Sequence, residues 1–251
     1  MISLDGRHAY VGDLELNGNR AGQASGFGNG VLAGLGSDWS ILQRLFVHDQ
    51  RFRGIDIVGS TGNLQAIKVL DCSVVSNGDA GIYLDSFTSD VTIRGCLVGS
   101  NTSHNVYSAG YVLHLMDCDI YSSGISGVFC DWPGAGTLIS NCGIDRNTQH
   151  GILIMTSNVS VACCTLHSNG QGATNTYGSV TLDNSSNPTL GVSVDGCNFW
   201  LDSGITDLVA YHILYNGTSA AKTHGNGFAA GSYGTGTISG PSLAKDANET
   251  G

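Results

Sequence analysis

The stretch GIYLDSFTSDVTIRGCLVGSNTSH, residues 81–104, decides the fold. Apolar and polar residues alternate over 81–85 and again over 91–93, and the apolar segment 96–98 forms a third strand. An alternation with a period of two predicts short β-strands that bury one face. A turn over 86–90, a bend at 94–95 and a loop over 99–104 separate the three segments. One period of the chain therefore contains three short strands.

Cysteine shows that this period recurs along the chain. Six cysteines are separated by 24, 22, 24, 22 and 33 residues: Cys72, Cys96, Cys118, Cys142, Cys164 and Cys197. The same frame extends back to Leu45 and Leu14, and forward to Asn226, which gives about nine registers. Strands this short cannot bury a face alone, so the repeats are expected to stack on one another.

The residue before each frame position is typical of a sharp corner. Seven of the nine are Gly, Asn or Asp, in the series Asp13, Arg44, Asp71, Gly95, Asp117, Asn141, Cys163, Gly196 and Gly225. These three residue types tolerate the left-handed backbone conformation best. The pattern predicts a left-handed corner between the second and third strands of every coil.

The repeat resembles the right-handed parallel β-helix of the pectate-lyase-like superfamily, which includes virus tailspikes and many polysaccharide lyases and hydrolases. VGDLELNGN at residues 11–19 and the segment 81–96 carry the resemblance best. The fold expected is all-β: a single-stranded right-handed parallel β-helix, or solenoid, of about nine coils with three short strands each. We assign it to residues 1–230, without an N-terminal cap of its own, and expect 231–251 to be an irregular Gly/Ser/Thr-rich segment.

Composition excludes several partners. The net charge is −10 and charged residues are only 12% of the chain, so a nucleic-acid backbone would be repelled. No apolar run approaches the ~20 residues that cross a membrane, and the N-terminus lacks the apolar core of a signal peptide. We therefore expect neither nucleic acid nor membrane as a partner.

The eight cysteines are expected to be free thiols. Six recur in register, so they would lie above one another inside the solenoid, which favours assembly in a reducing cytoplasm. No CxxC pair or HExxH sequence occurs, so we expect no metal and no cofactor.

In the family, polysaccharide commonly binds along the outward face of the first strand, and two outward columns of this chain fit that role. The first, here called the central column, contains Leu32, Asp56, Tyr83, Tyr107, Phe129, Leu153 and Thr181. The second column contains Val58, Asp85, Ala109, Asp131, Met155 and Asp183, with Trp132 beside it. The predicted substrate-binding residues are Tyr83, Tyr107, Phe129, Trp132 and Asp56, with the aromatic rings as a platform for sugar faces.

Catalysis is assigned to carboxylates of the second column. Asp85 and Asp131, and likewise Asp131 and Asp183, fall two coils apart, about 9.6 Å along the axis. Carboxylates of inverting glycosidases are about 6.5–9.5 Å apart, so either pair is admissible. One member would have to be the protonated general acid.

Two functions remain open at this point. The first is binding, with or without cleavage, of surface polysaccharide by a tailspike-like module. The second is a non-enzymatic structural or adhesive β-helix whose apolar outer stripe is a subunit interface, as in a homotrimer. Both place the protein on a virion or an extracellular surface. Motifs of polygalacturonases are absent, and Lys68, Lys222 and Lys245 are the only lysines available to a lyase.

Overall fold

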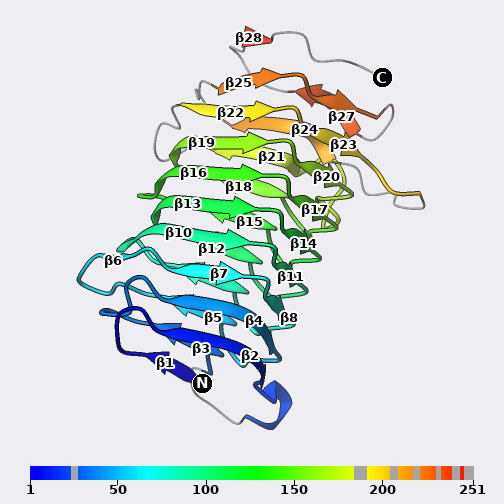
Figure 1. Cartoon of the computed structure of the whole chain (residues 1–251). Coiled ribbons are helices and arrows are strands. Elements are labelled where there is room, and N and C mark those ends of the chain that lie inside the picture. The colour runs from blue at the N-terminus through cyan, green and yellow to red at the C-terminus, as the bar shows by residue number, and fades with distance from the viewer. Residues whose placement is uncertain are drawn as a thin grey trace.

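The computed structural model describes residues 1–23, 28–183, 191–203, 209–216, 221–229, 233–238 and 244–245. Over these residues the chain winds into a solenoid of stacked coils (Figure 1). Its strands pair in parallel with those of the neighbouring coils, and η1 (Arg20–Gly22) is the single short helix described. The predicted all-β, right-handed parallel β-helix is therefore confirmed.

The first strand of each coil belongs to a ten-stranded parallel sheet. Its strands are β1 (Ile2–Leu4), β3 (Val31–Ala33), β5 (Ile55–Ile57), β9 (Ile82–Leu84), β12 (Val106–Ser108), β15 (Val128–Cys130), β18 (Ile152–Ile154), β21 (Gly178–Asp183), β24 (Val209–Asn216) and β27 (Tyr233–Ile238). Most are only three residues long, so every coil depends on its neighbours for backbone hydrogen bonds.

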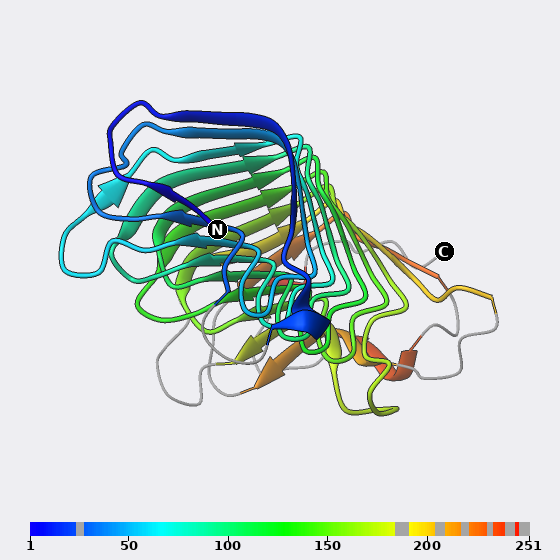
Figure 2. The ribbon, with the colours of Figure 1, turned by 90° about the horizontal axis from the view of Figure 1, so that it is seen from below.

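The second and third strands of the coils form one bent eighteen-stranded sheet. Second strands are β6 (Leu64–Gln65) with β7 (Lys68–Leu70), β10 (Thr88–Arg94), β13 (Tyr111–Met116), β16 (Ala135–Ser140), β19 (Ser157–Ala162), β22 (Val192–Asp195), β25 (Ala221–His224) and β28 (Ala244–Lys245). Third strands are β8 (Ser73–Val75), β11 (Leu97–Gly99), β14 (Asp119–Tyr121), β17 (Gly143–Asp145), β20 (Thr165–His167), β23 (Asn198–Trp200) and β26 (Gly227–Phe228). The long strands β2 (Tyr10–Asn17) and β4 (Ile41–His48) run through the bend and join the two sets. Seen from below, the coils lie over one another around a common interior (Figure 2).

The corner between second and third strands has the predicted conformation. All nine residues that precede the frame positions have a positive φ, from 50° at Arg44 to 66° at Gly95. Arg44 and Cys163 adopt it although neither belongs to the favoured types. The left-handed corner is thus set by the repeat itself, and the side chain at the corner only lowers its cost.

The six frame cysteines form a buried ladder, and all eight cysteines are free. The backbone N–H of Cys96 donates to Sγ of Cys118 at 3.4 Å, and that thiol lies 3.1 Å from the carbonyl of Met116. Asn226 continues the ladder, because its Oδ1 accepts the N–H of Cys197 at 2.9 Å. Cys118, Cys197 and Asn226 therefore each accept a backbone N–H from the coil before them, as well as filling the core.

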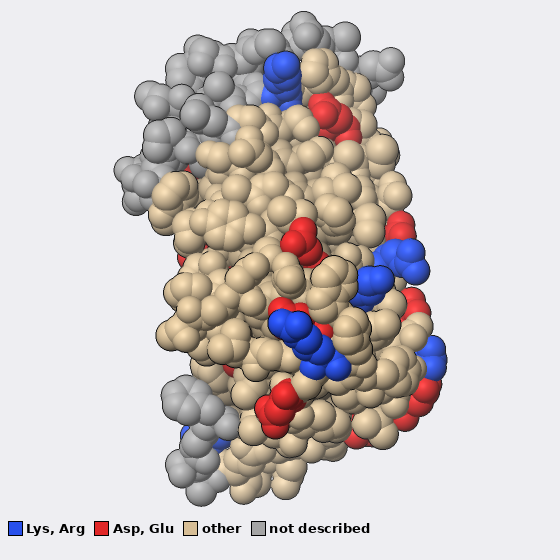
Figure 3. Space-filling model, turned by 60° about the vertical axis from the view of Figure 1, so that its left-hand side comes forward, with Lys and Arg blue, Asp and Glu red and all other residues tan. Residues whose placement is uncertain are grey.

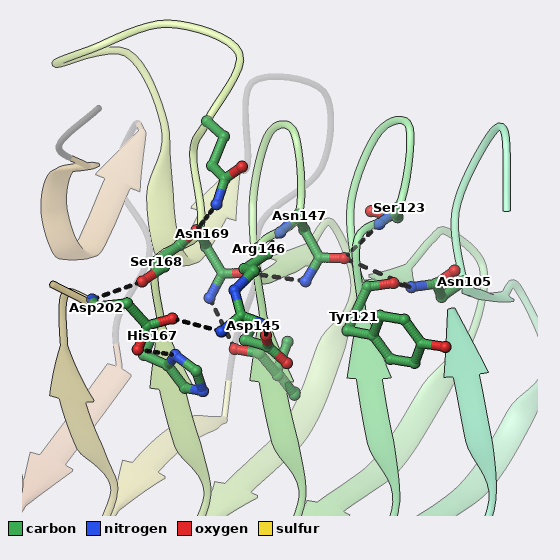
Figure 4. A network of polar contacts seen from close by, with 12 residues as sticks. Asn105, Tyr121, Ser123, Asp145, Arg146, Asn147, His167, Ser168, Asn169 and Asp202 are labelled. Atoms are coloured by element: carbon green, nitrogen blue, oxygen red, sulfur yellow. Dashed lines mark hydrogen bonds and ion pairs between the residues drawn. The ribbon is translucent and has the colours of Figure 1, made fainter. Parts of the chain in front are cut away.

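A second buried ladder, of amides, closes each coil (Figure 4). Asn147 donates to Oδ1 of Asn169 at 2.8 Å and accepts the backbone N–H of Ser123 at 2.9 Å. Ser123 has no amide to continue the row. Asn105, which directly precedes β12 in the same coil, takes its place, with its amide nitrogen 3.5 Å from Oδ1 of Asn147. The row thus stays hydrogen-bonded through the coil that lacks an asparagine.

The C-terminal segment differs from expectation. We predicted irregular chain over 231–251, but β27 pairs with β24 and β28 pairs with β25. The prediction is wrong for these two strands because they continue the two sheets by one further level.

Candidate functional site

The predicted central column lies on the outward side of the ten-stranded sheet, which we call the first-strand face, and the residues of the second column follow the strand ends or, for Asp183, end a strand. In the register of the sheet, Asp56 pairs with Tyr83, Tyr83 with Tyr107, and Tyr107 with Phe129. Leu153 and Thr181 follow in the next two coils. The flanking residues of each strand, such as Ile82 and Leu84, are buried in the core. The period-two pattern therefore separated the core side chains from the central column, although Asp56 and Thr181 of that column are also buried.

The aromatic rings of the central column pack on one another along the solenoid axis. Tyr83 and Tyr107 are stacked, with ring centroids 4.7 Å apart and planes inclined by 7°. Phe129 meets Tyr107 edge-on at 5.3 Å, and the Arg53 guanidinium lies 3.3 Å from the centroid of Tyr83. Tyr83 therefore has no free ring face for a sugar, and the predicted platform is wrong there. The reason is that the spacing of strands in a sheet, about 4.8 Å, also suits ring stacking.

Arg53 lies at the N-terminal side of the column and is held by two carboxylates. Its Nη1 is 2.7 Å from Asp56 and its Nε is 3.3 Å from Asp79. Asp56 also accepts a hydrogen bond of 2.7 Å from the amide of Asn29. Burial raises the pKa of Asp56, and the hydrogen bonds from Arg53 and Asn29 offset only part of that rise. Asp56 is therefore a member of a buried ion pair before any ligand binds.

Tyr107 and Asp131 form the central polar contact of the face. The Tyr107 hydroxyl donates to Oδ2 of Asp131, and the backbone N–H of Trp132 donates to Oδ1 at 2.8 Å. Burial raises the pKa of Tyr107, and the neighbouring carboxylate raises it further, so the phenol stays protonated. The Trp132 side chain beside them is 53% exposed. Asp131 thus faces an accessible aromatic side chain while one neighbour fixes its orientation.

His104 packs against the aromatic rings next to the Tyr107–Asp131 contact. Its ring centroid is 4.9 Å from that of Phe129 and 6.0 Å from that of Tyr107. Burial lowers its pKa to about 4, so the imidazole is neutral at pH 7. Its Nδ1 is buried and has no hydrogen-bond partner within the described part of the chain. A neutral ring with an unused nitrogen can accept or relay a proton.

His150 occupies the corresponding position two coils further on. Its Nδ1 accepts the backbone N–H of Gly178 at 3.2 Å and lies 2.7 Å from the Thr181 hydroxyl. Because Nδ1 accepts, the neutral ring carries its proton on Nε2. Burial lowers its pKa to about 4, although the charge of Asp183 opposes the shift. The sequence analysis did not select either histidine; the signal was their shared place three residues before an outward first-strand residue.

Asp85 has a structural role in this arrangement. Its carboxylate accepts three backbone N–H groups, from Gly59 at 3.1 Å and from Ser60 and Phe87 at 3.0 Å. It therefore anchors its own turn and the loop after β5. Asp183 ends β21 and pairs with Asn216 of β24. Of the three predicted catalytic carboxylates, Asp131 is the one that contacts the aromatic column.

Exposed aromatic side chains follow the ends of three consecutive first strands. They are Phe87 after β9, Tyr111 after β12 and Trp132 after β15, exposed by 45%, 43% and 53%. The sequence analysis found only Trp132; Phe87 lies in a similar turn, and Tyr111 is the first residue of β13. The face of the solenoid drawn in Figure 3 is mostly uncharged, with a few acidic and basic side chains on it. This row, here called the turn row, presents accessible aromatic surface that the stacked column lacks.

A separate polar network lies on the third-strand side (Figure 4). Arg146 bridges Asp145 at 3.1 Å and Asp202 at 2.9 Å, and His167 lies 3.1 Å from Asp202. These charges are paired among themselves. Within the described residues, no three His, Cys, Asp or Glu side chains are grouped as a metal ion requires.

A family model described as "Right handed beta helix region" matches residues 53–228. The match spans more than half of the chain, which therefore belongs to the right-handed β-helix family. No curated protein sequence matches the chain. No helix in its described part is long and apolar enough to cross a lipid bilayer.

Solved structures of three kinds share the fold. The A-module of the Azotobacter vinelandii mannuronan C-5 epimerase AlgE6 superposes with a TM-score of 0.69 at 18% identity, covering 97% of this chain and 76% of that one. An alginate lyase from Paenibacillus sp. str. FPU-7 gives 0.72 at 13% identity, covering 96% and 88%. Tailspike protein 2 of bacteriophage CBA120 gives 0.64 at 12% identity, covering 85% and 35%. At these identities the likeness establishes the fold alone.

Proposed function

We propose that the protein binds and cleaves surface polysaccharide along the first-strand face. The observation that carries the proposal is the Tyr107–Asp131 contact, with neutral His104 behind it and exposed Trp132 beside it. Carbohydrate sites combine aromatic surface for the apolar side of a sugar with carboxylates that accept its hydroxyl hydrogens. Here the turn row supplies the aromatic surface, and Asp131 supplies the carboxylate.

The chemistry that fits this arrangement is acid–base cleavage of a glycosidic bond. Asp131 and Asp183 are two coils apart, about 9.6 Å by strand spacing, close to the separation that admits a water molecule between them. One carboxyl group would protonate the leaving oxygen and the other would take a proton from the attacking water. Asp85 is the weaker candidate because its oxygens accept three backbone N–H groups.

Structural likeness supports the substrate class. The similar structures are named as a mannuronan epimerase, an alginate lyase and phage tailspikes. They support polysaccharide binding or modification here, and the tailspikes support a location on a virion or extracellular surface.

The second candidate is a non-enzymatic module that assembles through the same face. Leu153 and Met155 give the columns an apolar, half-buried stretch in the coil between Asp131 and Asp183. A homotrimer would bury it. In light scattering this candidate predicts a trimer that dissociates when Leu153 is replaced by Asp, whereas the enzyme needs no such assembly.

The direct test is release of reducing ends from bacterial capsule and lipopolysaccharide preparations. We expect the wild type to release them and Asp131→Asn to be slower by about 10²-fold or more, the range for lost acid–base catalysis. Asp119→Asn is the matched control, because Asp119 is exposed on β14 in the other sheet. Full activity of Asp131→Asn would remove Asp131 as the catalyst.

A further inference from the structure

The charges on the first-strand face are unbalanced. Asp56, Asp85 and Asp131 lie on its two columns, and among the described residues Arg53 is the basic side chain that contacts one of them, Asp56. Within the described part of the chain, other Lys and Arg residues lie on the eighteen-stranded sheet, on η1 or in loops. Arg51, two residues before Arg53, donates instead to the carbonyl of Gln23.

Arg53 has little capacity left for an anionic ligand. Two of its nitrogens are engaged by Asp56 and Asp79, and its plane covers the Tyr83 ring. The Arg53 side chain is only 18% exposed. Recognition of a carboxylate by arginine relies on two parallel N–H donors, and here Nη1 and Nε are already committed. The combined negative charge of Asp56 and Asp79 exceeds the single positive charge of Arg53.

His104 and His150 add no positive charge to offset the aspartates of the first-strand face. Burial lowers the pKa of both His104 and His150 to about 4, so neither is cationic at neutral pH. Both oxygens of Asp131 accept hydrogen bonds, from the Tyr107 hydroxyl and from the backbone N–H of the exposed Trp132, so this group offers a ligand carboxylate acceptors and no donor. A ligand carboxylate on this face would therefore meet carboxylates without a free cation to pair with.

We propose that the polysaccharide taken by the first-strand face is uncharged, not a polyuronate. This inference rests on the function proposed above and names its substrate class. The hydroxyl groups of neutral sugars can donate to the aspartates, whereas a uronate adds a negative charge that Arg53, already paired with Asp56 and Asp79, does not balance. The aromatic turn row needs only the apolar sides of sugar rings.

The substrate class also determines the reaction. β-Elimination removes the hydrogen on the carbon next to a uronate carboxyl group, and a neutral sugar offers no such activated hydrogen. Cleavage is therefore hydrolysis. Water supplies a hydroxyl group to the anomeric carbon and a proton to the leaving oxygen as the glycosidic C–O bond breaks. No oxidant, reductant or cofactor is needed.

The test compares polymers that differ only in charge. Polygalacturonate and alginate are each used with their carboxyl-reduced forms, which keep the linkages but are neutral, and binding to the full chain is measured by calorimetry at low and high salt. We expect each reduced form to bind at least about tenfold more tightly at low salt, with a smaller difference at high salt. Asp79→Asn frees Nε of Arg53 and removes one negative charge, so it should reduce the difference in affinity between the native and the carboxyl-reduced polymers.

Tighter binding of either native polyuronate at low salt would overturn the inference and leave the proposed polysaccharide function standing. Absence of binding by all four polymers, together with no release of reducing ends from capsule or lipopolysaccharide, would overturn both. Detection of unsaturated uronate products would overturn the hydrolysis step in particular.

Discussion

Replacing Cys118 with Ala is expected to destabilise the protein by more than the loss of a buried sulfur accounts for. The sulfur of Cys118 accepts the backbone N–H of Cys96, which is itself buried in the neighbouring coil. Without the thiol that N–H has no acceptor. The substitution therefore combines a small cavity with an unsatisfied buried donor.

The magnitude follows from separating these two effects. Loss of the side-chain atoms costs on the order of 1 kcal/mol of transfer free energy. An unsatisfied buried N–H adds about 1–3 kcal/mol. Cys130 is the matched control: it is equally buried, on β15, and no described backbone N–H donates to its sulfur. We expect Cys118→Ala to lower the free energy of unfolding by about 1–3 kcal/mol more than Cys130→Ala.

Cys118→Asn is the rescue variant. At the equivalent position Asn226 accepts the N–H of Cys197 and donates to the carbonyl of Val194, both at 2.9 Å. An asparagine at 118 is therefore expected to restore the acceptor and recover most of the stability. Urea unfolding followed by circular dichroism measures all three variants. Equal losses in Cys118→Ala and Cys130→Ala, or an asparagine variant no better than alanine, would refute the ladder's hydrogen-bonding role.

Two further predictions concern the whole solenoid. Burial lowers the pKa of His104, His150 and His212 to about 4, so the folded state resists protonation. The stability that these neutral histidines give the folded state is fully present above pH 6.5. The free energy of unfolding decreases by about 1.4 kcal/mol per pH unit for each histidine between pH 6.5 and 4. Urea midpoints that stay constant from pH 7 to 4.5 would contradict this. Gly124→Ala should destabilise the protein strongly because the added Cβ would lie 2.0 Å from a backbone oxygen. Gly34→Ala is the control and should not destabilise it, because nothing lies within 4 Å of the added Cβ. Thermal unfolding compares the two variants, and similar melting temperatures would contradict the close packing of the coils.

The coil, its corners and its inward residues could be predicted because each depends on a local repeat. Asp71 and Gly95 predict the left-handed corner directly, because their residue types favour that conformation. The positive φ of Arg44 and Cys163 is predicted by their position in the repeat, although their residue types do not favour it. Alternation with a period of two also fixes which residues face outward. These features need no knowledge of side-chain torsions.

The arrangement of outward side chains could not be predicted in the same way. Tyr83 and Tyr107 were correctly placed on neighbouring coils, but the sequence pattern does not say that their rings stack on each other. Asp85 was placed in the correct column, yet its bonds to Gly59 and Ser60 depend on the path of a loop. Such contacts are set by torsions and turns, which the alternation leaves open.

The solenoid suits a binding function because its site residues stand on paired strands. Tyr107 lies on β12, and Asp131 follows β15 directly, so adjacent hydrogen-bonded strands set their spacing. Sites built on strands hold their geometry better than sites built on long loops. A polymer running along the axis would meet a carboxylate of the second column in every second coil, at Asp85, Asp131 and Asp183.

The most direct test of the account is the affinity of Trp132→Ala for the polysaccharide from which the wild type releases reducing ends. Loss of an exposed aromatic contact at the site should weaken binding about tenfold. Phe46→Ala, which removes an exposed aromatic from β4 in the other sheet, should bind as the wild type does. Wild-type affinity in Trp132→Ala, or an equal loss in Phe46→Ala, would show that the first-strand face does not hold the polymer.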